Sequence, residues 1–303
     1  MIYRILSLDG GGIRGVLTAQ LLCRIDQEDP GFLKSIDLFA GTSTGSIIAS
    51  ALAMELSPQD IVRFYKEKGS SVFNYNLKNK IRSLGGLLFS RYRTTPLQMA
   101  LYDVFGKTLL WQVKHKLLLS SFQLDNHNPI FPSNGGVRSW KAKFFHNFCE
   151  STNKDVNTEI VELILRSCSA PIFFPIHNGF VDGGVCANNP AMCAVAQAIH
   201  VGNNIADLRV CSLGTGDNPQ YIDALNKSWG LLQWNIKAID MLLDSDVGLV
   251  DYQCREILGN NYYRFNPILC SAVGLDDASK IDVLIEIANQ LDIDPIISWI
   301  NKN

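Results

Sequence analysis

Three glycine-rich turns carry the residue types that could do chemistry in this sequence. They are the runs Asp9 to Gly15, Gly41 to Gly45 and Asp182 to Gly184. Each follows a short apolar run of the kind that forms a buried strand. In open α/β sheets, ligands bind beyond the carboxyl ends of the strands, so these turns are where a site is expected.

The first turn is suited to holding an anion. Its glycines, Gly10, Gly11, Gly12 and Gly15, let successive backbone N–H groups point into one concavity at a helix N-terminus. Such a loop can stabilise a bound phosphate or an oxyanion that forms only during a reaction. The same spacing fits a dinucleotide-binding fingerprint, but Asp37 lies at the start of the next strand, not at its carboxyl end. No Gly-Lys-Ser/Thr follows, which disfavours a P-loop.

The second turn has the spacing of a nucleophile elbow. Gly41 and Gly45 flank Ser43, an apolar run precedes the turn, and a run of small residues typical of a helix follows it. In this setting the serine hydroxyl would project above the sheet. A serine that merely caps the following helix is the alternative.

A serine nucleophile needs a base, and the third turn offers one. Asp182 precedes Gly183 and Gly184, and glycines beside a carboxylate allow close approach to other backbone. The five histidines carry no comparable signal and are interpreted as surface or packing residues; they are His115, His127, His146, His177 and His200. Asp182 is therefore the better candidate for the base.

The elements that must position these turns alternate along the chain. Strands are expected near 3–8, 36–40, 116–124, 140–148, 179–181 and 208–213, with helices near 16–25, 46–54, 158–168 and 190–200. A further helix begins after the cap Ser57 and is expected to end at Gly69. This alternation predicts a three-layer α/β/α fold with a mostly parallel central sheet.

Composition narrows the function classes. The chain has 303 residues, 47% of them hydrophobic, and 27 basic against 29 acidic side chains, so nucleic acid is not expected as a partner. The eight cysteines show no zinc-binding spacing. The first residues lack a cleavable signal peptide, which favours a cytoplasmic location and leaves leaderless secretion open.

Together and in this order, the three turns resemble the patatin-like phospholipase family. The family pattern is D-G-G-G-x-R-G, then G-x-S-x-G, then D-G-G or D-G-A, and the resemblance spans about residues 2–216. It implies a single catalytic domain over 1–303, in which 217–303 is a helical completion of the motif-bearing part. The implied fold is the patatin-like three-layer sandwich.

The resemblance also implies an activity and a set of roles. Ser43 would be the nucleophile and Asp182 the general base of a Ser-Asp dyad, with an oxyanion hole in the loop Gly10, Gly11, Gly12, Arg14 and Gly15. The reaction would be phospholipase A-type hydrolysis of fatty-acyl esters through an acyl-serine, without metal or cofactor. A Ser-Asp-His esterase and a lipid-binding regulatory module with little turnover remain as alternatives, and an activating protein or small molecule stays open.

One segment suggests contact with a membrane surface. Between Glu67 and Asp103 the chain has six basic residues and no acidic one, interleaved with aromatic and apolar residues. Such a segment could bind anionic lipid or cover Ser43; an ordinary solvated loop is the alternative. The candidate interfacial residues are Lys78, Lys80, Arg82, Leu87, Leu88 and Phe89.

Overall fold

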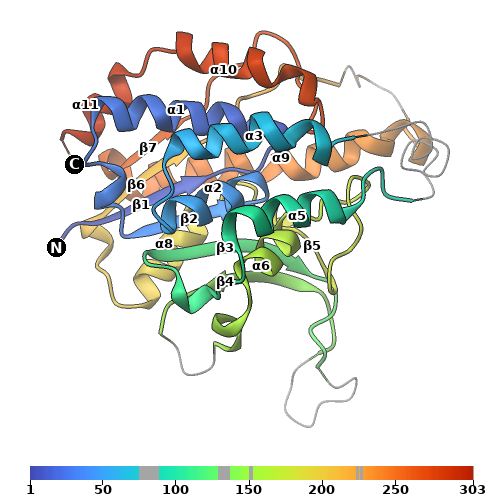
Figure 1. Cartoon of the computed structure of the whole chain (residues 1–303), viewed down its shortest axis with the longest axis horizontal. Coiled ribbons are helices and arrows are strands. Elements are labelled where there is room, and N and C mark those ends of the chain that lie inside the picture. The colour runs from blue at the N-terminus through green and yellow to red at the C-terminus, as the bar shows by residue number, and fades with distance from the viewer. Residues whose placement is uncertain (75–88, 129–136, 150–152, 223–224, 226–227, 303) are drawn as a thin grey trace.

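The computed structural model describes residues 1–74, 89–128, 137–149, 153–222, 225 and 228–302, and within them the fold is built on one sheet (Figure 1). The strands are β1 (Tyr3–Leu8), β2 (Leu38–Thr42), β3 (Lys116–Gln123), β4 (Lys141–His146), β5 (Phe180–Asp182), β6 (Leu208–Leu213) and β7 (Tyr262–Phe265). Their order is β4-β3-β2-β1-β6-β7, and β5 also pairs with β3.

The sheet is mostly parallel, as the sequence predicts. Strands β3, β2, β1, β6 and β7 run parallel to one another, whereas β4 and β5 run antiparallel to β3. The parallel strands therefore bring their carboxyl ends, and the turns that follow them, to a single edge of the sheet.

Helices cover both faces of the sheet. On one face lie α1 (Gly15–Glu28), α2 (Thr44–Ala53), α3 (Pro58–Val72), α5 (Thr94–Phe105) and α6 (Ile160–Ser167). On the other lie α8 (Ala191–His200) and α9 (Leu231–Leu258), and the short helix α7 (Gly184–Ala187) follows β5. The three-layer α/β/α architecture expected from the sequence is therefore observed.

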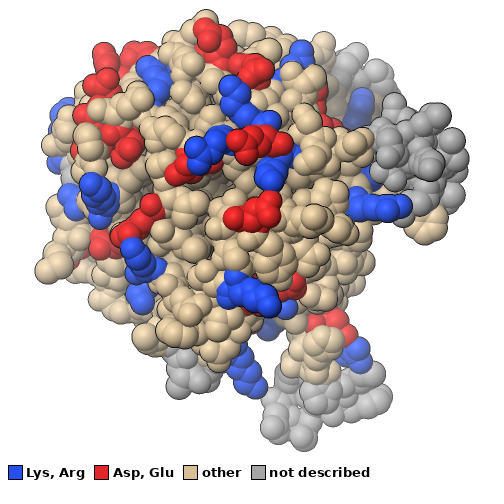
Figure 2. Space-filling view, in the orientation of Figure 1, with Lys and Arg blue, Asp and Glu red and all other residues tan. Residues whose placement is uncertain are grey.

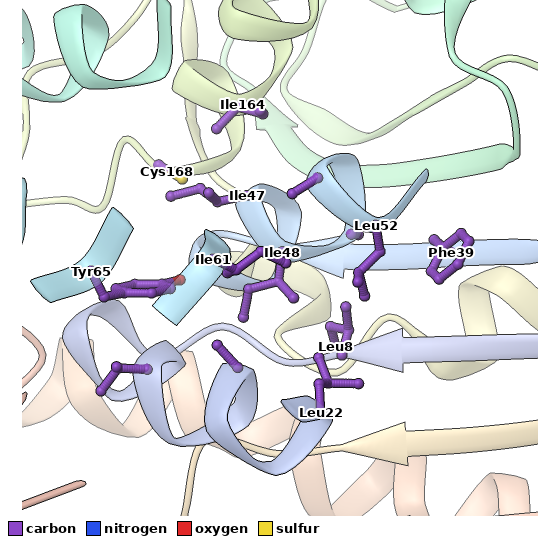
Figure 3. Packing of buried hydrophobic residues seen from close by; sticks show 14 of the residues in the cluster. Leu8, Leu22, Phe39, Ile47, Ile48, Leu52, Ile61, Tyr65, Ile164 and Cys168 are labelled. Atoms are coloured by element: carbon purple, nitrogen blue, oxygen red, sulfur yellow. The ribbon is translucent and has the colours of Figure 1, made fainter. Parts of the chain in front are cut away.

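Alternation along the strands supplies both hydrophobic cores. In β1, Leu6 and Leu8 join the core under α1 and α2, while Ile5 joins the core under α8. Figure 3 shows the first core, where Leu8 lies near Leu22 of α1. Both faces of the strand are apolar because both are covered by helices.

Helix α3 confirms one prediction of a helix boundary and corrects another. The Ser57 hydroxyl accepts a hydrogen bond from the Asp60 N–H at 3.1 Å, as expected for an N-cap. The helix does not end at Gly69 but continues to Val72. A Cβ at Gly69 would lie 2.9 Å from Ile13 Cδ1 and 2.8 Å from Ile281 Cδ1, so this glycine provides space for close packing and does not end the helix.

The C-terminal part adds a strand as well as helices. β7 pairs with β6 and extends the sheet, although only helices were expected after residue 217. Helix α10 (Ile281–Gln290) packs outside α1 and α3, and α11 (Asp294–Ile300) contacts β7. The expected helical completion thus also contributes to the sheet.

Surface charge is mixed on the face that Figure 2 shows. Basic and acidic side chains lie interspersed there, and the described residues form no patch of a single sign on it. Within the described ranges, none of the helices combines the length and the apolar character needed to cross a bilayer.

Candidate active site

Strand pairing brings Ser43 and Asp182 together. Thr42, the last residue of β2, pairs with Ser120 of β3, and Asp182, the last residue of β5, pairs with the next residue, Ser121. Because β4 occupies the other edge of β3, β5 continues along the edge that β2 leaves. Asp182 therefore lies just beyond the carboxyl end of β2, where Ser43 follows.

Ser43 has the strained backbone of an elbow. Its φ is 52° and its ψ is −123°, a conformation that non-glycine residues rarely adopt. A Cβ on Gly41 would lie 2.2 Å from the carbonyl oxygen of Gly45, and a Cβ on Gly45 would lie 2.1 Å from that of Leu8. Both flanking positions therefore require glycine, as the sequence pattern indicates.

Asp182 is buried, with a relative exposure of 2%. Burial raises the pKa of its carboxyl group to about 6, and hydrogen bonds from the Gly184 N–H and the Ser43 hydroxyl partly counter this effect. The distance from Gly184 N to Asp182 Oδ1 is 2.7 Å. A Cβ on Gly183 would lie 2.4 Å from the Ser120 carbonyl oxygen, so the second residue of this turn must also be small.

The first glycine loop lies beside the serine. A Cβ on Gly10 would lie 3.3 Å from Ser43 Cβ, and the Gly10 N–H donates to the Asn188 carbonyl oxygen at 3.1 Å. Among the hydrogen bonds of the described residues, none comes from the N–H groups of Gly11 or Gly12. Both residues line the cavity around Ser43.

Two buried side chains brace this loop. Arg14 donates to the carbonyl oxygens of Gly11 and Gly216 at 3.4 and 3.2 Å. Arg264 of β7 makes a bidentate ion pair with Asp9, and the two side chains are 5% and 3% exposed. Because Gly15 packs against Thr44 and Tyr65, the loop is also held from the side of α2 and α3.

Arg264 is not among the site residues expected from the sequence, all of which precede residue 217. It lies in no motif, and its only local signal is a basic residue within an apolar, aromatic run. The loop before α10 also lies in no motif, so its contact with the first glycine loop was not predicted. In this contact the Leu275 carbonyl oxygen accepts a hydrogen bond from the Ile13 N–H at 2.8 Å.

A cavity of about 220 Å³ contains Ser43 and Asp182. Its wall is mainly apolar and rich in aromatic side chains, and it also includes charged groups such as Lys68, Arg91 and Asp276. The apolar lining comes from Ile47, Phe64, Tyr65, Val72, Phe73, Leu97, Cys168, Phe173 and Phe174. Figure 3 shows Ile47 of α2 next to Cys168.

A more polar groove adjoins the cavity. The two share Arg14, Asn188, Asn218, Gln220 and Asp244, and the groove continues along α9 past Lys237 and Ser245. This groove is not predictable from the sequence, because its residues come from separated segments that only folding brings together.

The remaining candidates are placed as follows. All five histidines belong to the described residues, and none of them lines the cavity; His177 Nε2 contacts Glu162 Oε2 at 2.9 Å. Phe89 is 60% exposed. The other interfacial candidates, Lys78, Lys80, Arg82, Leu87 and Leu88, lie outside the described residues.

Comparison with known proteins identifies relatives over nearly the whole chain. Protein teg of Priestia megaterium is 29% identical, covering 99% of this chain and 98% of the relative. A protein of Pseudomonas aeruginosa named cGAMP-activated phospholipase is 26% identical, covering 87% and 78%. VipD from Legionella pneumophila is a solved structure with a TM-score of 0.44 and 11% identity, covering 95% of this chain and 67% of that one.

The family comparison covers the three glycine-rich turns. The model of the family described as patatin-like phospholipase matches residues 6–195, more than half of the chain and a range that includes Ser43, Asp182 and the first glycine loop. The chain therefore belongs to the patatin-like phospholipase family.

Proposed function

We propose that the protein is a lipid acyl hydrolase that cleaves fatty-acyl esters of phospholipids through an acyl-serine intermediate. Ser43 is the nucleophile and Asp182 the general base. The observation that carries the proposal is the pairing along β3, which sets a buried carboxylate beside a strained serine at the end of an aromatic cavity. Family membership supports the reaction class.

The geometry supports a two-step reaction. In the first step, Asp182 takes the Ser43 proton as the serine oxygen attacks the ester carbonyl, and the amides of Gly11 and Gly12 stabilise the oxyanion. Collapse expels the alcohol, which receives the proton, and leaves the acyl-serine. Water then attacks the acyl group in the same way, which releases the fatty acid and restores Ser43.

The raised pKa of Asp182 supports its role as a base. An ordinary aspartate, with a pKa near 3.9, is a weak base toward a hydroxyl group. Burial brings the pKa to about 6, closer to neutral pH, where general-base catalysis is more efficient. The oxyanion donors supply the rest of the stabilisation, since losing one such donor typically costs about 10²–10³ in rate.

The two parts of the cleft fit the two parts of a lipid. The aromatic cavity can bury the acyl chain next to Ser43, where each buried CH₂ contributes about 0.8 kcal/mol. The polar groove that adjoins it can hold the head group through amide and carboxylate side chains such as Asn218, Gln220 and Asp244.

Covalent labelling tests the proposal. A fluorophosphonate probe should label the wild-type protein, and Ser43→Ala should abolish the label together with fatty-acid release from phospholipid vesicles. Ser50→Ala is the matched control, because Ser50 is a buried serine of α2, the helix that follows Ser43, and does not line the cavity. Lipid binding without label or release would favour a regulatory lipid-binding module and contradict the proposal.

We further propose peripheral contact with a membrane surface through the basic segment between Glu67 and Asp103. Support comes from the sequence of this segment and from the exposure of Phe89 at its described end. Co-sedimentation with vesicles containing anionic lipid should decrease when Lys78, Lys80 and Arg82 are reversed to glutamate. Binding that is indifferent to these changes and to anionic lipid would contradict it.

The whole chain is proposed to act as one catalytic domain. Pairing of β7 with β6 and packing of α10 on α1 support this unit. A truncation after Gly216 should therefore fail to fold or to react with the fluorophosphonate probe.

Activation by a small molecule is proposed by analogy with the relative named for cGAMP, and adding cGAMP to the vesicle assay tests it.

A further inference from the structure

The segment from Val273 to Asp276 lies directly against the oxyanion loop. The Leu275 carbonyl oxygen accepts from the Ile13 N–H at 2.8 Å, and a Cβ on Gly12 would lie 2.2 Å from the same oxygen. Gly12 has a φ of +58°, which an L side chain rarely adopts. The Leu275 carbonyl oxygen therefore packs directly against the backbone of Gly12, a residue that lines the cavity.

Side chains anchor this segment at its two ends. Asn218 holds one end, because its side-chain amide donates to the Val273 carbonyl oxygen and accepts from the Val273 N–H, each at 3.0 Å. Asp276 holds the other end: its Oδ2 accepts from the Tyr92 hydroxyl at 2.7 Å and contacts Arg91 Nη1 at 3.3 Å. Asp276 is thus next to the residue that contacts the oxyanion loop.

Arg91 and Tyr92 belong to residues 89–93, which we call the strap. The strap is held against the chain after α6, since the N–H groups of Arg91 and Tyr92 donate to the carbonyl oxygens of Ile172 and Phe173, each at 2.8 Å. The Tyr92 ring lies 5.7 Å from that of Phe174, which lines the acyl end of the cavity. The strap therefore packs against the aromatic wall of the cavity.

We propose that Asp276 is a positioning residue that couples the strap to the oxyanion loop. Through Leu275, it holds the Gly11 and Gly12 amides in the orientation that receives the oxyanion, and through Tyr92 it links that orientation to the wall that contacts the acyl chain. The inference rests on the proposed function. It adds a role for a carboxylate that lines the cavity but takes no part in proton transfer.

Kinetics on a short soluble ester test this role. With p-nitrophenyl butyrate, Asp276→Ala should lower kcat about tenfold and leave KM within about twofold, because misplaced oxyanion donors affect the transition state more than the bound ester. Affinity for an alkyl boronic acid, which forms a tetrahedral anion on serine, should fall by a similar factor. Asp276→Asn keeps an acceptor for the Tyr92 hydroxyl and should recover most of the loss.

A second pair of variants separates positioning from general loss of structure. Tyr92→Phe should also lower kcat, and adding it to Asp276→Ala should lower kcat little further, because Asp276→Ala already removes the hydrogen bond that Tyr92→Phe removes. Asp277→Ala is the matched control: this neighbouring carboxylate accepts from the Ser279 hydroxyl and should leave kcat unchanged.

Three outcomes would overturn the inference. The first is a folded Asp276→Ala protein that keeps the wild-type kcat and the wild-type affinity for the boronic acid. If Ser43→Ala is inactive in the same assay, this result contradicts the role of Asp276 and leaves the proposed function standing. The second is a lowered Tm in every Asp276 variant, Asp276→Asn included, with KM and kcat affected to the same extent. This result would show that Asp276 has a structural role only. A wild-type protein that neither hydrolyses the ester nor binds the boronic acid would remove both proposals.

Discussion

The motif-bearing part of the chain, residues 2–216, and the C-terminal part, 217–303, contribute to the site in different ways. The first provides the groups proposed to react, Ser43 and Asp182, together with the glycine loop. The second provides contacts behind that loop, from Arg264 to Asp9 and from Leu275 to Ile13. A loop made of glycines has little conformational preference of its own, so its shape must be imposed by neighbouring segments.

The two parts also differ in how they depend on residue type. The reacting groups must be a serine and a carboxylate, and Gly41, Gly45 and Gly183 cannot be replaced without a clash. The support from Leu275 comes from a backbone carbonyl, which any residue could supply. Changes in the first part should therefore remove the chemistry, whereas changes in the second should weaken the structure that aligns it.

The largest expected effect is on the proposed base. Asp182→Asn should lower fatty-acid release by at least about 10³-fold, because an amide cannot accept the Ser43 proton. Turnover on phospholipid vesicles measures it. Asp207→Asn, at the opposite end of the sheet, should leave turnover unchanged; an active Asp182→Asn protein would end the dyad proposal.

A change in the C-terminal part should affect stability more than chemistry. Arg264→Met leaves Asp9 as a buried, unpaired carboxylate, and breaking such a pair typically costs about 3–5 kcal/mol of unfolding free energy. Urea denaturation at neutral pH measures this loss. Arg255→Met is the control, because its pair with Asp251 on α9 is more exposed and should contribute less than about 1 kcal/mol. Equal losses in the two variants would contradict the bracing role of Arg264.

The pH profile should reflect Asp182. Its pKa lies near 6 and only the ionised form accepts a proton, so kcat/KM should fall about tenfold per pH unit below 6 and level off above it. Stopped assays on a soluble ester between pH 4.5 and 8 measure this limb. If kcat/KM instead falls to half of its maximum near pH 4, burial does not raise the pKa of Asp182 as described.

The smallest effects should come from the histidines. His177→Ala and His200→Ala should each keep activity within about twofold, since neither residue lines the cavity with Ser43. Esterase assays on folded protein measure them. An inactive but folded His200→Ala protein would favour a Ser-Asp-His hydrolase over the dyad.

The sequence predicts most of the fold around the three turns, and the described structure shows why. Apolar runs ending in glycine became β1 and β2, and the Ser57 cap begins α3 as expected. The prediction that α3 ends at Gly69 was wrong because a glycine that terminates a helix and one that admits the side chains of Ile13 and Ile281 look the same in one sequence. Strand β7 was missed because, unlike the shorter β5, it is not followed by a glycine-rich turn.

By itself, the sequence determined the residue types and their spacing: a serine between two glycines, a carboxylate before two more, and a loop rich in glycine. Only the tertiary structure decided that Ser43 and Asp182, 139 residues apart, meet, because β5 takes up the edge of β3 where β2 ends. It also decided which distant groups hold the loop. Spacing along a chain encodes local geometry, whereas ion pairs such as Arg264 with Asp9 form between any positions that folding brings within reach.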